Sequence, residues 1–298
     1  MLKVLITGSS GFLGRHLTQL YVSQNVFELN RYFGDYKISL ENEIPNFNEV
    51  YELVIHSAGK AHSIPKTESE RKSFFDNNVG GTFNLLRGLE KSGVPKKFVF
   101  VSSVSVYGLN AGANINEEYP LLAKDAYGKS KIEAEQLIKN WCDENDVKFT
   151  VLRLPLLVGG NPPGNLGSML KAIRKGFYFN IGGGKARKSM VLAEDVAKVI
   201  GTASEVGGIY NLTDGYHPSF AELSNHISIQ LGKGKIRNMP MWCASIIANF
   251  GDLLGSKVPL NTNKLKKITS DLTFDDSKAK EAFGWNPTPV LEGFTSNI

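Results

Sequence analysis

The chain has 298 residues, of which 42% are apolar and 21% are charged, and its formal net charge is +5. This length and composition are ordinary for a globular protein and allow one large or two modest domains with a full hydrophobic core. The positive charge is mild and spread along the chain, so it favours anionic small molecules and argues against nucleic acid as a partner.

The two cysteines, Cys142 and Cys243, lie far apart and form no metal-like pair. We interpret them as free thiols in a reducing compartment. The first core strand is predicted so near the N-terminus that no signal peptide is expected. The most apolar stretch, 240–254, is interrupted by polar residues and is too short to span a bilayer. We therefore expect a cytoplasmic protein with no membrane partner.

The first predicted strand is the apolar run 2–6, and a helix is predicted at 15–21. Between them, Gly8, Gly11 and Gly14 stand at intervals of three residues. Glycines at this spacing let the chain turn tightly, let a pyrophosphate approach the backbone, and let the helix pack on the strand. Because the helix N-terminus adds free N–H groups and a positive dipole end, the stretch predicts a nucleotide-binding turn.

Strands and helices alternate after this turn. Further apolar runs predict strands at 26–29, 53–56, 97–101 and 149–154, and helical spacing predicts helices at 74–91 and 129–141. This alternation predicts an α/β fold with a doubly wound parallel sheet. Ligands of such a sheet bind beyond the carboxyl ends of its strands.

Near residue 159 the pattern changes. The Gly/Pro/Asn cluster 159–165 predicts a boundary between a domain at 1–160 and a smaller one at 161–298. Segments near 190–213 are expected to return to the first domain. The segment 239–254 carries apolar residues at helical spacing and is interpreted as a core helix of the second domain. A membrane-lying helix is the alternative, but its polar side lacks the expected Lys and Arg.

Tyr127 and Lys131 stand four residues apart at the start of a predicted helix, so their side chains project from one face. A phenol with a pKa of about 10 transfers protons poorly at neutral pH, but a neighbouring ammonium favours its ionised form. We therefore expect a lowered pKa and a general acid or base at Tyr127. Alone, the pair would indicate an ordinary helix surface. Ser103, just after the strand 97–101, adds a hydroxyl at the ligand edge of the sheet and favours catalysis.

Together these motifs resemble the extended short-chain dehydrogenase/reductase family, which includes nucleotide-sugar epimerases, dehydratases and reductases. The resemblance runs over nearly the whole chain, through the glycine turn, His56-Ser57-Ala58-Gly59, Asn77-Asn78-Val79-x-Gly81-Thr82, the serines at 102–105, Tyr127-x-x-x-Lys131, Leu152-Arg153-x-Pro155 and the closing segment 272–287. It implies a Rossmann-type domain with a smaller C-terminal substrate-binding α/β domain, an NAD(P) cofactor and a homodimer built on the helices 74–91 and 129–141.

The resemblance also implies a catalytic triad of Ser103, Tyr127 and Lys131, with Lys131 also binding the nicotinamide ribose. The residues implied to contact the cofactor are Gly8, Ser10, Gly11, Phe12, Leu13, Gly14, Asn30, Arg31, Ser57, Ala58, Gly59, Asn78, Val101, Tyr127, Lys131, Leu154 and Pro155. Asn30 occupies the position where an acidic residue binds the adenosine 2′-hydroxyl, and the following Arg31 suits a 2′-phosphate. NADP(H) is therefore favoured over NAD(H).

Val104-Ser105 replaces the Asp-Glu pair of the family's dehydratases, and Val104 replaces the glutamate of its decarboxylases. Reduction of the 4-keto group of a UDP-6-deoxy-4-keto-N-acetylhexosamine, for surface polysaccharide synthesis, is therefore the favoured activity, with Tyr127 as general acid. A UDP-N-acetylhexosamine 4-epimerase is the alternative, and a non-catalytic NADP-binding sensor is a remote one. The residues expected to face the UDP-linked sugar are Lys60, His62, Ser105, Leu156, Asn165, Arg187 and Lys188. For His62 and the basic loop 182–188, an ordinary solvated surface is an equal alternative.

Overall fold

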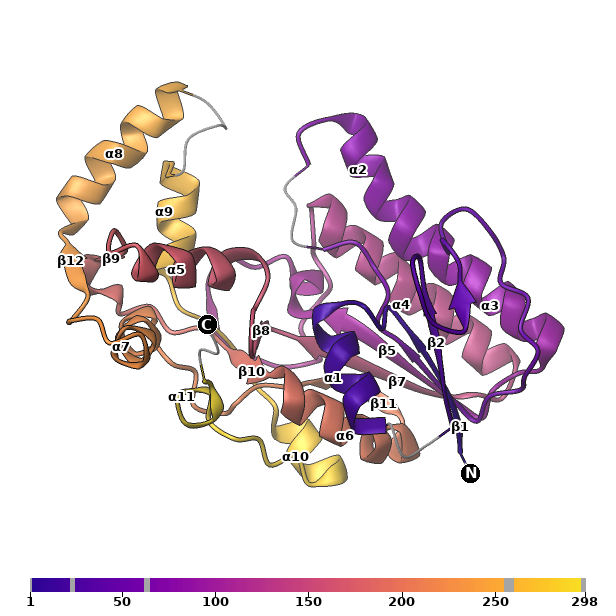
Figure 1. Cartoon of the computed structure of the whole chain (residues 1–298). Helices are drawn as coiled ribbons and strands as arrows, with labels where there is room; N and C mark the ends of the chain where they lie inside the picture. The colour runs from indigo at the N-terminus through magenta and orange to yellow at the C-terminus, as the bar shows by residue number, and fades with distance from the viewer. Residues whose placement is uncertain (1, 22–24, 62–64, 255–259, 296–298) are drawn as a thin grey trace.

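A seven-stranded parallel sheet lies at the centre of the larger part of the molecule (Figure 1). The computed structural model describes residues 2–21, 25–61, 65–254 and 260–295. The sheet strands are β1 (Lys3–Thr7), β2 (Asn25–Asn30), β3 (Tyr36–Lys37), β4 (Leu53–His56), β5 (Lys97–Ser103), β7 (Lys148–Leu154) and β11 (Gly208–Asn211). Their order is β11-β7-β5-β4-β1-β2-β3, and each neighbouring pair is parallel. This order confirms the predicted doubly wound sheet of the Rossmann type.

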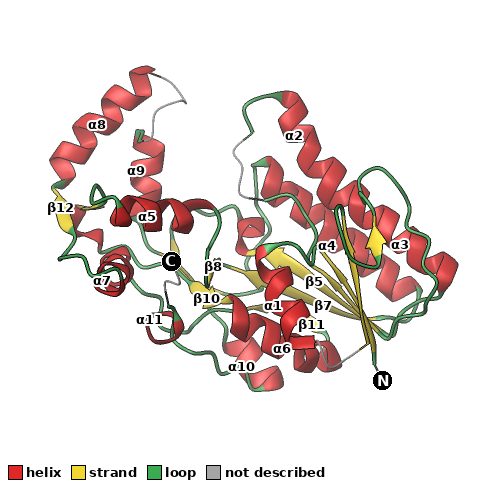
Figure 2. Ribbon diagram, viewed as in Figure 1, coloured by secondary structure: helices red, strands yellow, loops and turns green. Residues whose placement is uncertain are grey.

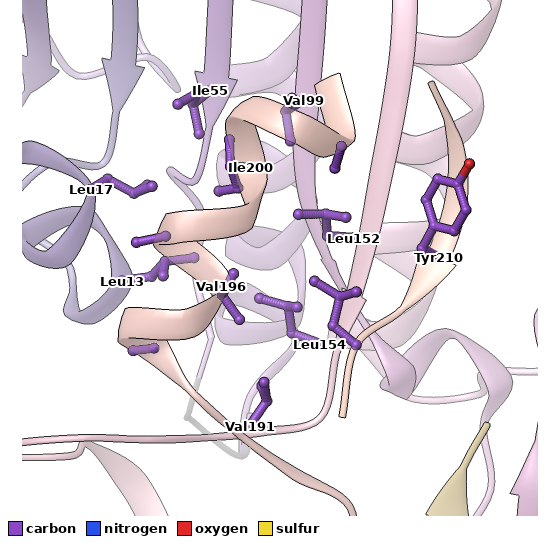
Figure 3. Close-up of a cluster of buried hydrophobic side chains, with 14 of the residues drawn as sticks. Leu13, Leu17, Ile55, Val99, Leu152, Leu154, Val191, Val196, Ile200 and Tyr210 are labelled. Atoms are coloured by element: carbon purple, nitrogen blue, oxygen red, sulfur yellow. The ribbon is translucent and has the colours of Figure 1, made fainter. Parts of the chain in front are cut away.

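Helices cover both faces of the sheet, as Figure 2 shows. On one face lie α1 (Phe12–Leu20) and α6 (Ala193–Val206), and on the other lie α2 (Glu68–Phe75), α3 (Gly81–Ser92) and α4 (Ala126–Glu144). Figure 3 shows the first interface, where leucines of α1 meet valine and isoleucine side chains of α6 above β4, β5 and β7. The strands are apolar on both faces because both faces are covered.

The predicted helix 74–91 is not a continuous α-helix. A π-helical segment, η2 (Asp76–Gly80), separates α2 from α3. Asn78 of this segment is buried, whereas Phe83 on α3 is 49% exposed. Short π segments inside α-helices are frequent at functional sites.

The second part of the molecule contains short paired strands and several helices. The pairs are β6 (Gly112–Ile115) with β13 (Leu272–Phe274), β8 (Leu156–Val158) with β10 (Met190–Leu192), and β9 (Phe179–Ile181) with β12 (Arg237–Met239). The helices are α5 (Gly164–Arg174), α7 (Phe220–Gln230), α8 (Met241–Leu254), α9 (Thr262–Thr269), α10 (Ser277–Phe283) and α11 (Val290–Gly293), with short 3₁₀ turns η3 (Val104–Tyr107) and η4 (Gly182–Gly184). Leucine, isoleucine and methionine side chains of α5, α7 and β10 form its own buried cluster.

The interpretation of the segment 239–254 as a core helix is wrong. In α8, Trp242 is 67% exposed, Phe250 is 62% exposed and Leu253 is 83% exposed. The buried side of α8 carries the small residues Ala244 and Ala248, which cluster with Leu265 of α9. No helix in the described ranges is long and apolar enough to cross a membrane.

Candidate active site

The glycine turn joins β1 to α1 and leaves no room for side chains. Gly8 has a φ of +73°, and a Cβ there would lie 2.7 Å from the backbone N of Ala58. A Cβ on Gly14 would lie 2.1 Å from the carbonyl oxygen of Gly8. Gly11 caps α1 with no side-chain hydrogen bond, and the first turn of α1 has no acidic residue. The open N–H groups and the positive end of α1 therefore fit the pyrophosphate of a dinucleotide. Ser10, Phe12 and Leu13 lie in the same turn.

Asn30 and Arg31 lie where β2 ends, one strand away from the glycine turn. Asn30 Oδ1 accepts hydrogen bonds from the backbone N–H groups of Tyr32 and Phe33 at 2.9 and 3.0 Å, and Asn30 Nδ2 donates to Ser9 Oγ at 2.9 Å. The Asn30 side chain therefore holds the loop after β2 as an Asx turn. Arg31 Nη2 lies 2.6 Å from Glu41 Oε1 and is about half exposed.

A chain of buried hydrogen bonds orders the end of β4. His56 Nε2 lies 2.8 Å from Thr82 Oγ1, whose own hydroxyl donates to the carbonyl oxygen of Asn78 at 2.6 Å. Nε2 must therefore carry the imidazole proton, and Nδ1 accepts from Thr7 Oγ1 at 2.7 Å. Burial lowers the pKa of His56 to about 3, so the ring is neutral. This network joins β1, β4 and α3 beneath the candidate cofactor site.

The π segment η2 places Asn78 beside the loop that follows β4. Asn78 Oδ1 accepts from the backbone N of Lys60 at 2.6 Å, and Nδ2 donates to Ser130 Oγ at 2.9 Å. A Cβ on Gly59 would lie 2.9 Å from Asn78 Oδ1. Ser57 and Ala58 both bond to Thr7 of β1. Ser57 Oγ donates to the Thr7 carbonyl oxygen, and the Ala58 N–H donates to Thr7 Oγ1. The predicted cofactor residues after β4 are thus fixed against both β1 and η2.

The three predicted catalytic residues converge from β5 and α4. Asp125 caps α4 by accepting from the Gly128 N–H at 3.0 Å, which starts the helix one residue before Tyr127. Ser103 is the last residue of β5, and its hydroxyl lies beside the Tyr127 phenol, where it acts to lower the pKa of that phenol. Ser103 Oγ also donates to Ser105 Oγ at 3.1 Å. The hydroxyls of these serines and of Tyr127 therefore lie at one place on the carboxyl edge of the sheet.

Lys131 is buried behind this group of hydroxyls. Its ammonium donates to the carbonyl oxygen of Val101 at 2.7 Å and lies 4.1 Å from the ring centroid of Phe100. Burial lowers its pKa to about 7, while the negative charge of Glu135 opposes this shift. The remaining cofactor predictions, Leu154 and Pro155, lie at the end of β7, which pairs with β5.

The expected lowering of the Tyr127 pKa by Lys131 is wrong for this structure. Burial raises the pKa of Tyr127, and the Ser103 hydroxyl beside it opposes this shift. The Lys131 ammonium is directed at Val101 and Phe100, where it does not offset the desolvation of the phenol. Tyr127 is therefore protonated at neutral pH, as a proton donor must be.

The predicted substrate residues fall into three groups. Lys60 and Ser105 lie at the site. The backbone N–H of Lys60 donates to Asn78, and the Ser105 hydroxyl accepts a hydrogen bond from Ser103. Leu156 starts β8, directly after Pro155. Asn165 is exposed on α5, Arg187 Nη1 donates to the carbonyls of Tyr216 and His217, and Lys188 Nζ donates to the carbonyl of Lys267 at 3.0 Å. Arg187 and Lys188 thus contact other segments, and the role of all the predicted substrate residues stays a prediction. His62 lies outside the described residues.

The sequence interpretation missed a buried polar group beside the triad. Glu135, one turn after Lys131, accepts hydrogen bonds from Ser102 and forms an ion pair with Arg153. The spacing of four residues from Lys131 could have placed Glu135 on the same helix face. The partner on β7 could not be inferred from spacing.

Comparison with known proteins identifies a protein family for this chain. A family model, described as the NAD dependent epimerase/dehydratase family, matches residues 4–213, which include the glycine turn, Ser103, Tyr127 and Lys131. The chain belongs to this family. The resemblance to extended short-chain dehydrogenase/reductases is thereby confirmed, and this epimerase/dehydratase-family protein is an NAD(P)-dependent enzyme.

Two curated relatives of this chain are 4-epimerases of sugars carried by a diphosphate. It is 28% identical to a UDP-glucose 4-epimerase of Vibrio cholerae, over 98% of this chain and 93% of that protein. It is also 28% identical to the N-acetyl-alpha-D-glucosaminyl-diphospho-ditrans,octacis-undecaprenol 4-epimerase of Escherichia coli O157:H7, over 99% and 94%. The crystal structure of a Thermotoga maritima UDP-glucose 4-epimerase with UDP-glucose superposes with a TM-score of 0.75 at 22% identity, over 96% of this chain and 94% of that chain, and confirms the fold.

Proposed function

We propose that this enzyme reduces the 4-keto group of a 6-deoxy-4-keto-N-acetylhexosamine linked to UDP, for surface polysaccharide synthesis. The observation that carries the proposal is the protonated, buried phenol of Tyr127 beside Ser103. A ketone that gains a hydride at carbon must gain a proton at oxygen, and a protonated phenol at hydrogen-bond distance supplies it.

Each residue of the site has a distinct task in this proposal. Tyr127 Oη donates the proton to the C4 oxygen of the sugar, and Ser103 Oγ holds the same oxygen by a hydrogen bond. The Lys131 ammonium, held by the Val101 carbonyl, would bind the nicotinamide ribose. A bound nicotinamide cofactor would supply the hydride. The glycine turn fits its pyrophosphate, because Gly8 and Gly14 let the backbone of the turn pack closely and the N-terminus of α1 carries no side-chain cap.

We propose that NADP(H) is preferred to NAD(H). Asn30 Oδ1 is already occupied by two backbone N–H groups, and Asn30 carries no carboxylate for an adenosine 2′-hydroxyl. Arg31 is paired with Glu41 at the surface, where such a pair is weak. A 2′-phosphate could therefore replace Glu41 as the partner of Arg31.

A 4-epimerase acting on a UDP-N-acetylhexosamine is the second candidate. Both 28% identical relatives named above are 4-epimerases. The Ser103, Tyr127 and Lys131 group would serve this reaction too, because epimerisation at C4 passes through a ketone that is formed and then reduced.

A homodimer built on the helices α3 and α4 also remains a proposal, which sedimentation velocity tests directly.

The deciding experiment mixes the purified protein with UDP-4-keto-6-deoxy-N-acetylglucosamine and follows nicotinamide absorbance, with NADPH and NADH in parallel. Stoichiometric loss of reduced cofactor is expected, faster with NADPH. No net loss, together with interconversion of UDP-N-acetylhexosamines by the same preparation, would replace the reductase by the epimerase. Neither reaction, with intact cofactor binding, would contradict both proposals and favour a sensor.

A further inference from the structure

The outward side of α8 is a row of large apolar side chains, at the outer edge of the molecule (Figure 1). Spacings of three and four residues place four of them on one helix face, the apolar face of α8: Trp242, Ile246, Phe250 and Leu253. Their exposed fractions are 67%, 49%, 62% and 83%. The alanines that pack on α9 lie on the opposite side of the helix. Since no described segment of the chain covers the apolar face, it indicates an interaction surface.

The apolar face of α8 carries no charge. Between residues 241 and 254 the sequence holds one charged residue, Asp252, and its carboxylate accepts a hydrogen bond from the backbone N–H of Thr262 at 3.2 Å. The face can therefore leave water without burying an unpaired charge. Trp and Phe are also among the residues that amphipathic helices place at the boundary between lipid headgroups and acyl chains.

The segment around α8 is strongly basic. Residues 223–270 contain seven of the 34 Lys and Arg residues of the chain but one of its 29 Asp and Glu residues. The formal net charge of this segment is therefore +6 and that of the rest of the chain is −1, against +5 for the whole chain. The positive charge is thus less evenly spread than the composition suggests. Exposed basic residues stand just before α8 and on α9, at Lys233, Lys235, Arg237, Lys266 and Lys267.

An uncharged apolar face with basic neighbours fits the surface of an anionic lipid bilayer. An amphipathic helix binds such a surface by burying its apolar face, while Lys and Arg side chains contact the anionic headgroups. The polar side of α8 itself lacks Lys and Arg, but the residues before and within β12 and those of α9 supply them. A second copy of the chain fits this face poorly, because two segments of charge +6 would repel each other.

We propose that α8 docks this protein on the surface of an anionic lipid bilayer, with its apolar face inserted at the level of the headgroups. The expectation of no membrane partner depended on the length of this stretch and on the missing Lys and Arg of its own polar side. A helix that lies on a bilayer needs no spanning length. The inference goes beyond the proposed function, because it involves neither the sugar nor the cofactor, and its test needs no turnover.

The test is sedimentation of the protein with vesicles of phosphatidylcholine that contain phosphatidylglycerol, and with vesicles of phosphatidylcholine alone. The chain supplies its own probe, because Trp141 and Trp285 are 6% and 4% exposed and Trp242 is the exposed member of its three tryptophans. We expect binding to the phosphatidylglycerol vesicles, a blue shift of the tryptophan emission, and quenching by lipids brominated on the acyl chain. Binding is expected to weaken at high salt and on phosphatidylcholine alone, since the attraction of the basic residues is then screened or lost.

The apolar face is tested by Trp242→Gln/Phe250→Gln. Neither ring is buried in the protein, so folding should change little, whereas the affinity for phosphatidylglycerol vesicles is expected to fall about tenfold or more. The matched control is Leu20→Gln/Val206→Gln, which removes two side chains that are 44% and 46% exposed at the ends of α1 and α6. These helices cover the seven-stranded sheet, away from α8 (Figure 1), so the control should bind vesicles as the unaltered protein does.

The basic neighbours are tested by Lys235→Gln/Arg237→Gln, just before α8. The affinity for phosphatidylglycerol vesicles is expected to fall about fivefold for each charge removed. The control removes two exposed charges from the part that contains the seven-stranded sheet, as Lys91→Gln/Lys96→Gln, and should weaken binding much less. Because these four positions are exposed, this pair of variants keeps the test valid even if the α8 double variant fails to fold.

Three results would overturn the proposal. The first is vesicle binding that a folded Trp242→Gln/Phe250→Gln protein retains in full, or that the two pairs of charge variants weaken equally. The second is absence of vesicle binding together with a dimer that the α8 double variant abolishes, which would assign the face to a second copy. The third is absence of vesicle binding by a protein whose oligomeric state the variant leaves unchanged, which would leave the face to an acidic protein partner.

Discussion

The carboxyl edge of the parallel sheet and the helix α8 are expected to differ in how strongly a substitution affects the protein. At the carboxyl edge of the sheet, the buried side chains of His56, Asn78 and Lys131 are hydrogen-bonded, and a Cβ on Gly14 would lie 2.1 Å from a carbonyl oxygen. On α8, a whole indole ring at Trp242 stands 67% exposed. One atom should therefore matter more at the sheet edge than a large side chain does on α8. Burial and partnering, not side-chain size, decide the effect of a substitution.

The largest expected effect comes from removing one oxygen atom. Tyr127→Phe keeps the ring that packs 6.1 Å from the ring of Phe74 but removes the proton donor. Turnover is expected to fall about 10²–10⁴-fold, while cofactor binding stays nearly unchanged. The matched control is Tyr210→Phe, which removes a hydroxyl bonded to Gly207 at the edge of the sheet and should leave turnover intact. Steady-state kinetics and cofactor titration measure both, and unchanged turnover in Tyr127→Phe would remove its proposed role.

The next effect comes from adding one methyl group to the glycine turn. In Gly14→Ala the new Cβ meets the Gly8 carbonyl, so the turn must deform, at an expected cost of about 1–3 kcal/mol in unfolding free energy. Cofactor affinity is expected to fall with it, because the deformed backbone is the surface offered to the pyrophosphate. Gly234→Ala is the control, since nothing lies within 4 Å of a Cβ there. Equal cofactor affinity in the two variants would contradict the assignment of the turn.

A third substitution changes charge and almost no shape. Asn30→Asp keeps both acceptor bonds to the Tyr32 and Phe33 N–H groups. It loses the donor to Ser9 Oγ, but the Ser9 hydroxyl can donate to the new carboxylate instead, so folding should change little. The added carboxylate can accept the adenosine 2′-hydroxyl and repels a 2′-phosphate. The ratio of NADPH to NADH affinity is expected to fall about tenfold, or about 1.4 kcal/mol. A ratio that stays constant would show that the end of β2 does not contact the adenosine ribose.

Much of the part of the molecule that contains the seven-stranded sheet could be predicted, because the sequence patterns that indicate it involve only residues close together in the chain. The glycine spacing, the apolar strands and the Tyr127–Lys131 spacing each depend on neighbouring residues alone. The pKa of Tyr127 does not, since it depends on how deeply other segments bury the phenol, and its direction was predicted wrongly. The partnership of Glu135 with Arg153 likewise depends on which strand lies beneath α4. The π segment 76–80 has no strong sequence signal, so the sequence predicted one continuous helix at 74–91.

The interpretation of α8 failed for a different reason. An apolar stripe on a helix indicates the side that seeks burial, and the prediction assumed that this chain supplies the cover. In the structure, α8 packs on α9 through alanines, whose small side chains allow close approach. Hydrophobicity ranks Trp242 and Phe250 above Ala244 and Ala248, so sequence alone chose the opposite face.

The smallest expected effect therefore comes from the largest side chains. Replacing both Trp242 and Phe250 by Gln is expected to change the unfolding free energy by no more than about 0.5 kcal/mol per site, because neither ring is buried. Ala248→Asp on the same helix is the control, since it places a carboxylate at a fully buried position and should cost about 2 kcal/mol or more. Urea unfolding of the three proteins measures the difference. If the double Gln variant instead lost as much stability as Ala248→Asp, the rings would be buried in solution, and the contrast between α8 and the sheet edge would be wrong.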